Sequence, residues 1–285
     1  MNYTLIGAVP TRGVFQVDGW GWDDVTFGYA STSRQLNTPA TSGEIRLFGI
    51  YYEDFRPVTK VDNRSAADHA DIRIWTWGGH YVSDWKTSVG TFDAMGELAV
   101  QFGNWGVLRQ RASMFNTEAG FQPKVQQRLK PWLRGGYYYG SGDKNPNDGT
   151  HGTFFQLLPT ARPYARFPFF DMMNNVDRFG MLTLRPHPRF TIHTEAHALR
   201  LASGADLWYL GGGAYQPWSF GYQGRAGNGA TSLANLYDVN VDVTINSHFS
   251  VTPYYGFAQG KSVIQFIYPK GKDGHLALLE TNYRF

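Results

Sequence analysis

The sequence predicts an all-β fold, a single antiparallel β-barrel over residues 1–285 that crosses a membrane with about twelve strands. Aromatic residues make up 16% of the chain and it contains 33 glycines, a composition that favours strands joined by turns over helices. Many segments alternate apolar and polar residues with a period of two, as half-buried strands do. No apolar run reaches the roughly 18 residues of a spanning helix, so strands are the expected membrane-crossing elements.

The first half of the chain contains strand-length segments rich in aromatic and β-branched residues. We expect these strands near 13–19 and 24–31 and at 43–55, 68–80, 88–102, 105–119 and 126–140. Two short turns are predicted between them, at Gly103-Asn104 and Gln122-Pro123, because glycine, asparagine and proline interrupt strands.

The second half contains the clearest strand, 233–246, whose two faces differ in polarity. One face holds Tyr237, Val239, Val241, Val243 and Ile245, and the other holds Asp238, Asn240, Asp242 and Thr244. A short turn at 246–248 leads into a strand at 248–258, so the two strands are predicted to form a hairpin.

Two further strands, 178–185 and 189–201, flank Pro186-His187-Pro188, where the prolines prevent a strand from continuing. The last predicted strand, 279–285, carries Tyr283 and Phe285 as outward aromatics suited to the edge of a bilayer.

Connections of two kinds separate these strands. The three longest, 141–175, 202–232 and 259–272, are rich in Gly, Asn, Asp and Pro and fall at one end of the predicted barrel. The turns at 186–188 and 246–248 fall at the other end. This asymmetry is typical of outer-membrane barrels, in which the short turns are periplasmic.

Charged residues alternate with apolar residues along several strands. In 88–102, for example, Asp93, Glu97 and Gln101 oppose an apolar face that includes Phe92 and Leu98. The same rule assigns to the barrel interior Arg46, Arg73, Arg109, Arg111, Arg128, Lys130 and Arg134. An arginine facing lipid near the midplane costs roughly 2–4 kcal/mol, so these cations are predicted to line a wet lumen.

Cationic rings favour anions, and the guanidinium fork binds carboxylates through two hydrogen bonds. The acids expected to share the lumen are Asp93, Glu97, Glu195, Asp238, Asp242 and Glu280. They would keep anion binding weak enough for release. The alternative is a structural role, in which the cations and acids pair across the barrel and stiffen it.

His193, Glu195 and His197 share one face of a predicted strand, each about 7 Å from the next. The Glu is one position too late for the helical His-Glu-x-x-His zinc motif, so we expect lumen-lining residues and no metal. The spacing of Asp143 and Asp148 fails the calcium-loop pattern, and the chain contains no cysteine. No cofactor is expected, and a net charge of +3 gives no reason to expect nucleic acid.

The segment from Gly136 to Gly149, followed by Thr153 to Pro159, resembles the signature of the alginate export family of bacterial outer-membrane proteins. Members carry a strand ending in Gly-Tyr, a Ser-Gly-Asp turn, a Pro, and a Thr-Phe stretch that leads to Leu-x-Pro. The resemblance continues through Asn174-Asn175, Leu182 to Pro186, strand 189–201 and Asp206 to Tyr209, and it ends at Phe285. It is best over residues 126–285.

The resemblance implies a monomeric porin in the bacterial outer membrane whose charged lumen conducts an anionic polysaccharide or a related small anionic solute, with periplasmic export partners and no catalysis. It places Ser141, Gly142, Asp143 and Pro146 in a shared extracellular loop motif that acts through loop shape. Family members are usually longer, with around eighteen strands. The chain, which lacks a signal at Met1, is therefore expected to be either the C-terminal part of such a barrel or a narrower closed one.

The sequence therefore predicts a passive, anion-favouring outer-membrane channel of the alginate export type. Two alternatives remain open. One is a soluble or surface-attached all-β carbohydrate-binding or polysaccharide-lyase domain, which would also use aromatics and arginines. The other is a porin for small organic acids or apolar compounds, in which the lumen charges are purely structural.

Overall fold

A computed structural model describes residues 1–9, 24–66, 68–126, 128–157, 166–167, 172–211 and 222–285. The predicted strand at 13–19 lies outside these residues. The described residues are almost entirely β-structure, which confirms the predicted fold class.

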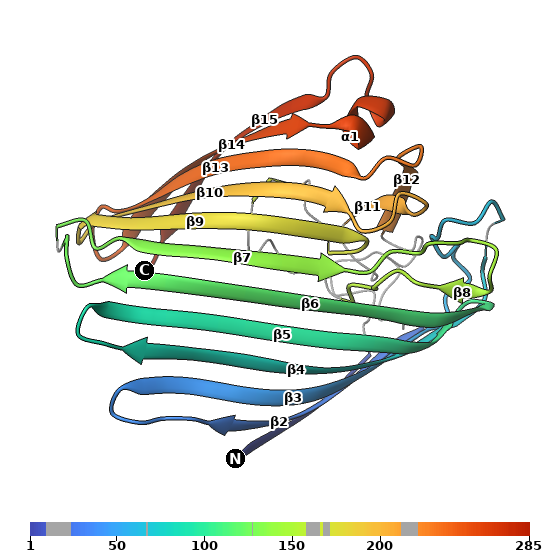
Figure 1. The fold of residues 1–285 in the computed structure, drawn as a ribbon, viewed down its shortest axis with the longest axis horizontal. Helices are drawn as coiled ribbons and strands as arrows, with labels where there is room; N and C mark the ends of the chain where they lie inside the picture. Colours follow the sequence, from blue (N-terminus) through green and yellow to red (C-terminus); the bar gives the residue numbers. More distant parts are fainter. Residues whose placement is uncertain (10–23, 67, 127, 158–165, 168–171, 212–221) are drawn as a thin grey trace.

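The described strands form one large sheet and one small one (Figure 1). The large sheet has 13 strands, ordered β1-β2-β3-β4-β5-β6-β7-β9-β10-β13-β14-β15, with β8 added parallel to β6; β11 and β12 pair separately. Their bounds in the first half are β1 (Asn2–Ala8), β2 (Val25–Gln35), β3 (Thr41–Asp54), β4 (Ile72–Lys86), β5 (Gly90–Trp105), β6 (Leu108–Pro123), β7 (Trp132–Gly140) and β8 (Thr150–His151). Those in the second half are β9 (Asn175–His187), β10 (Phe190–Leu201), β11 (Leu207–Gly211), β12 (Tyr222–Ala226), β13 (Ser232–Thr244), β14 (Phe249–Gly260) and β15 (Asp273–Tyr283), with one short helix, α1 (Ser262–Ile267).

Most predicted strands are present, with shifted ends. The predicted turn at Gly103-Asn104 is wrong, because β5 continues to Trp105 and the turn falls at Gly106-Val107. Gly106 has φ +58, and a Cβ there would collide with the Asp68 carboxylate, so this turn requires glycine. The strand at residues 2–8 was not predicted.

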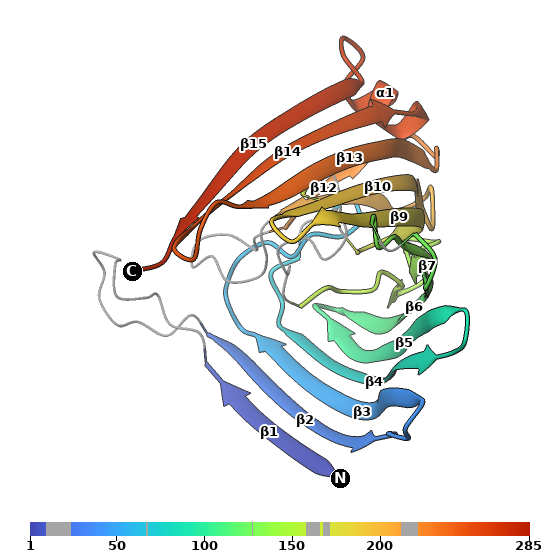
Figure 2. The ribbon, with the colours of Figure 1, turned by 90° about the vertical axis from the view of Figure 1, so that its left-hand side faces the viewer.

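The connections divide between the two ends of the sheet as predicted, except that the two-residue turn Gly106-Val107 lies at the end with the long loops. The long ones, after β7, β10 and β14, lie at one end together with residues 55–71, while short turns such as 188–189 and 245–248 lie at the other (Figure 1). We call these the long-loop end and the short-turn end. Among the described residues, β1 pairs only with β2 and β15 only with β14, so the curved sheet has two unpaired edges (Figure 2).

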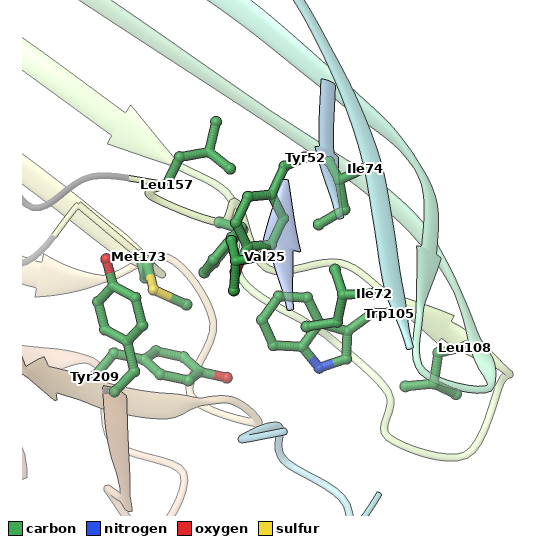
Figure 3. Packing of buried hydrophobic residues seen from close by; sticks show 11 residues of the cluster. Val25, Tyr52, Ile72, Ile74, Trp105, Leu108, Leu157, Met173 and Tyr209 are labelled. Atoms are coloured by element: carbon green, nitrogen blue, oxygen red, sulfur yellow. The ribbon is translucent and has the colours of Figure 1, made fainter. Parts of the chain in front are cut away.

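The main hydrophobic core lies on the concave side of the sheet at the long-loop end, where strand residues meet loop residues (Figure 3). Tyr52, Ile74 and Trp105 from the strands and Phe155 from the loop after β7 are completely buried there. The Phe155 ring packs 5.2 Å from that of Tyr52 and 5.1 Å from that of Trp105. The loops therefore fill this part of the concave side with apolar side chains.

Of the helical residues that the structure describes, none form a helix long and apolar enough to cross a membrane.

Replacing Phe155 with Ala should lower the free energy of unfolding by about 3–5 kcal/mol, because a buried ring is replaced by a cavity. Urea unfolding in detergent micelles, followed by tryptophan fluorescence, measures the loss. Phe115→Ala is the matched control, since Phe115 is 41% exposed on the opposite face of the sheet. Equal losses in the two variants would contradict this placement of the core.

Candidate functional site: the concave face of the sheet

The strand register decides which side chains share a face, because residues directly paired across an antiparallel ladder point the same way. Arg46 pairs with His80, and His80 pairs with Glu97, so these three side chains lie on one face. The same ladders carry Tyr52, Ile74 and Gly103 on that face, and Tyr52 and Ile74 belong to the core beneath the loops. This is therefore the concave face.

The convex face is apolar along most of its length. Leu47 and Leu98 are each 59% exposed, Trp77 is 52% exposed and Leu133 is 62% exposed. Large contiguous apolar surface of this kind marks an interaction with lipid or another apolar partner.

Most of the predicted lumen residues lie on the concave face. These are Arg46, Asp93, Glu97, Arg134, His193, Glu195, His197, Asp238, Asp242 and Glu280. The predicted separation of Asp93, Glu97 and Gln101 from the apolar row of β5 is correct. The sharing of one face by His193, Glu195 and His197 is also correct.

Arg73, Arg109 and Arg111, predicted to line the interior, are instead exposed on the convex face. Ile72, Leu108 and their apolar neighbours alternate with these arginines and would face lipid if the arginines lined the interior, but they are buried on the concave side. The prediction failed because it assumed a wet interior along the whole strand. At the long-loop end the interior is packed with loop side chains, so the apolar row of each strand turns inward.

Arg128 and Lys130 were predicted on a strand facing the interior with Arg134. That strand begins only at Trp132, and both residues are exposed in the connection between β6 and β7 at the short-turn end. Lys130 has φ +43, a left-handed conformation that strands do not adopt. Of this predicted group, only Arg134 lies on the concave face.

Arg134 is the centre of an ionic network. Its Nε donates to Asp93 Oδ1 at 3.1 Å and its Nη1 donates to Glu118 Oε2 at 3.1 Å. Trp132 Nε1 donates to the second Asp93 oxygen at 2.7 Å, and the guanidinium lies 4.5 Å from the Trp132 ring centroid. The Glu118 side chain is only 3% exposed, so this cation offsets part of the cost of burying its charge.

Histidines and carboxylates alternate across β9, β10 and β13. His197 Nδ1 lies 2.7 Å from Asp177 Oδ2, and its Nε2 lies 3.5 Å from Glu195 Oε2. His193 lies four residues before His197 on β10, nearer the short-turn end, and its Nε2 is 3.2 Å from Asp242 Oδ2. The His193 and Asp242 side chains are 29% and 48% exposed, so this part of the row is open to solvent.

Three further charges on the concave side are paired as well. Arg46 contacts Glu44 at 2.6 Å, His80 contacts Glu97 at 3.0 Å, and Arg166 contacts Glu280 at 2.9 Å. Tyr254 donates its hydroxyl to Asp238 at 3.0 Å. Polar and charged positions therefore recur on this face from β3 to β15.

The predicted loop motif after β7 is anchored to the interior. Ser141 Oγ accepts from the Ser113 amide at 2.9 Å and donates to the Gly152 carbonyl at 2.8 Å. A Cβ on Gly142 would collide with the Asn174 side chain, so only glycine fits there. Pro146 lies in the turn that follows.

The buried Asp206 holds this loop to the loop after β10. Its carboxylate accepts from the amides of Asp143 at 2.9 Å and Leu207 at 2.7 Å, from Thr153 Oγ1 at 2.6 Å and from the Tyr209 hydroxyl at 2.8 Å. Because Asp206 is only 1% exposed, these four donors replace the water that the carboxylate loses on burial.

Sequence reasoning missed Asp177, Glu118 and Glu44 as concave-face acids. Gln110, Asn116 and Glu118 are all even-numbered residues of β6 and therefore share a face. Sequence reasoning would have assigned Glu118 to the interior if it had used these residues, rather than Arg109 and Arg111, to decide which face of β6 is inside. Among the described residues, no group of three His, Cys, Asp or Glu side chains could hold a metal ion.

Comparisons with known proteins give one family. A family model described as Alginate export matches residues 21–263 of the chain. A search of curated proteins finds no match. Among solved structures, the translocator domain of the autotransporter NalP from Neisseria meningitidis is similar, with 12% identity and a TM-score of 0.29 over 99% of this chain and 86% of that chain. A structural similarity this low carries no conclusion about this chain.

Replacing Arg134 with Ala should lower the free energy of unfolding by about 2–3 kcal/mol, because Asp93 and the buried Glu118 lose their cation. Urea unfolding in micelles measures the change. Arg178→Ala, an exposed position on the convex face, should cost less than about 1 kcal/mol. A loss in the Arg134 variant no larger than in this control would contradict the network.

Replacing Asp206 with Ala should release the loops after β7 and β10, since each buried donor left without an acceptor costs about 1–3 kcal/mol. Hydrogen exchange at the Asp143 and Leu207 amides should become at least roughly tenfold faster. Asp148→Ala removes an exposed acceptor from the same loop and should leave both amides protected. Unchanged exchange in the Asp206 variant would show that the loops are held by apolar packing alone.

Proposed function

Because this chain belongs to the alginate export family of the bacterial outer membrane, we propose that the concave face of its sheet lines the path of a polar solute through a transport channel. The observation that carries the proposal is the contrast between the two faces of one wall. Away from the packed long-loop end, charged and hydrogen-bonding side chains are concentrated on the concave face, while Leu47, Trp77, Leu98 and Leu133 are exposed on the convex face. A wall of this kind separates water from lipid.

The first candidate solute is a polysaccharide of the alginate type, as the family name suggests. The paired charges suit such a chain, because a channel needs many weak sites rather than one strong one. Arg46 and Arg166 remain 43% and 35% exposed although each already has a carboxylate partner, so a passing carboxylate or hydroxyl can contact them without being held tightly.

The pairing of the charges supports a charge preference other than the one expected from the sequence. The arginines of this path, Arg46, Arg134 and Arg166, are each already paired with a carboxylate, although Lys86 at the short-turn end of β4 is exposed. The acids Glu97, Asp238 and Asp242 have only histidine or hydroxyl partners among the described contacts. We therefore propose a path that favours cations over small anions, with counter-cations accompanying any anionic polymer.

The loops at the long-loop end occupy part of the concave side, so they narrow the path there. The two unpaired edges also bear on the proposal. Unsatisfied backbone groups at a sheet edge are not tolerated in lipid, so β1 and β15 must be covered when the sheet forms a channel.

A soluble carbohydrate-binding or lyase domain is the alternative class, and the exposed apolar convex face disfavours it. A porin for small organic acids or apolar compounds would use the same wall with another solute. A cation-favouring channel and an anion-favouring channel are distinguished by the ions that they conduct.

Reversal potentials under a potassium chloride gradient in planar bilayers should show cation preference in the unmodified protein. Glu97→Gln combined with Asp242→Asn should shift the preference toward chloride, because both carboxylates are at least one-third exposed on the proposed path. Arg73→Gln is the matched control and should leave selectivity unchanged, since Arg73 lies on the convex face. Anion preference in the unmodified protein would restore the prediction made from the sequence.

A further inference from the structure

Three arginines that sequence reasoning assigned to the lumen lie on the convex face near the long-loop end, together with two others. They lie within four residues of that end on four strands and are all exposed: Arg73 on β4, Arg109 and Arg111 on β6, Arg178 on β9 and Arg200 on β10. We call this set the convex arginine belt. An arginine that faces lipid is costly at the midplane and is tolerated near the interface. The belt is therefore expected to lie at the membrane interface, where lipid headgroups can contact it.

Aromatic side chains mark the depth of the belt. Arg111 is paired directly with Phe102, which in turn pairs with Trp75 on β4. The Arg178 guanidinium lies 5.9 Å from the centroid of the Tyr137 ring. Aromatic residues of this kind sit at the level of lipid headgroups.

The distance from the belt to the aromatic residues at the other end of β5 also places the belt at the headgroup layer. Phe92, at the short-turn end of the same convex row, is stacked on Phe121 with ring centroids 4.5 Å apart. The ten positions from Phe92 to Phe102 extend over about 34 Å of strand, and a tilt of roughly 40° reduces this to about 26 Å along the membrane normal. That distance matches the roughly 25 Å apolar band of outer-membrane barrels, which leaves the belt at the headgroup layer.

Two members of the belt have no protein partner within the described part of the chain. Arg73 contacts Glu53 at 3.4 Å, and Arg200 donates to Thr231 Oγ1 at 3.2 Å. By contrast, the side chains of Arg109 and Arg111 form no ion pair or hydrogen bond with any residue that the structure describes. Neighbouring side chains on one strand face are about 7 Å apart, so two unpaired cations lie together at the headgroup layer.

A polar cleft of about 450 Å³ adjoins Arg111. Its lining includes Ser113, Tyr139 and Thr150, Lys144 from the loop after β7, and two acids of the same loop, Asp148 and the buried Asp143. Lys144 is exposed, so a second cation lies at the rim of this cleft. Hydroxyl groups and cations together are the donors that bind phosphate oxygens.

An apolar groove continues from the belt toward the middle of the convex face. It has a volume of about 760 Å³, and its lining includes Trp77, Leu98 and Phe115. Leu98 pairs with Phe115, and this pair lies four residues along β5 and β6 from the pair Phe102–Arg111. The groove therefore follows the cations along the same two strands. Phosphate-binding groups above an apolar groove match the two parts of a phospholipid.

We propose that Arg109 and Arg111, with Lys144 at the rim of the cleft, bind the phosphate groups of anionic lipids in the membrane leaflet at the long-loop end, while the groove beneath them receives an acyl chain. The site orients the wall in the membrane and is separate from the solute path on the other face. The site is expected to bind a lipid rather than free phosphate, because only a lipid occupies both the polar cleft and the apolar groove.

Titration of fluorescent phosphatidylglycerol into the protein in nonionic micelles tests the proposal, with fluorescent phosphatidylcholine as the uncharged comparison. The unmodified protein should bind phosphatidylglycerol more tightly. Arg109→Gln with Arg111→Gln should weaken that binding roughly thirtyfold, since each cation near anionic lipid contributes about 1 kcal/mol. Arg109→Lys with Arg111→Lys should retain most of the binding, because the charges remain.

Arg34→Gln is the matched control, since Arg34 is also exposed on the convex face but lies at the short-turn end. It should bind phosphatidylglycerol like the unmodified protein. Far-UV circular dichroism establishes that each variant is folded. Equal binding in the double Gln variant, an equal loss in Arg34→Gln, or displacement of the lipid by inorganic phosphate would each overturn the proposal.

Discussion

The antiparallel ladder is the constraint on which the rest of this structure depends. Each hydrogen-bonded rung fixes two side chains on the same face, and successive residues point to opposite faces. From β1 to β15, one choice of register therefore decides whether every charged residue meets water, lipid or packed protein. Arg46, His80 and Glu97 share the concave face because of their pairing, not because of any local preference.

What lies against the concave face changes along its length. At the long-loop end it is covered by loops whose aromatic side chains pack on Tyr52, Ile74 and Trp105, and the carboxylate of Asp206 ties two of these loops together. Toward the short-turn end the same face carries ion pairs that remain partly open to solvent, including His193 with Asp242. One continuous sheet thus supports a packed region and a polar path.

The distribution of arginines follows from this division. Where the inside is packed with apolar groups, the polar row of a strand points outward. Arg109 and Arg111 on β6 illustrate this, since the same strand places Glu118 inside only a few rungs further on.

Sequence alone determined the strand-rich fold, most strand positions, the division into long and short connections, and the family, because a period of two and turn-forming residues are local signals. It also placed His193, Glu195 and His197 on one face correctly. It could not decide which face of β4 and β6 is inside, because Ile72 and Leu108 are equally compatible with lipid and with a packed interior. Only the tertiary structure decided that, since the packing partners, such as Phe155, come from loops distant in the chain whose position no local pattern specifies.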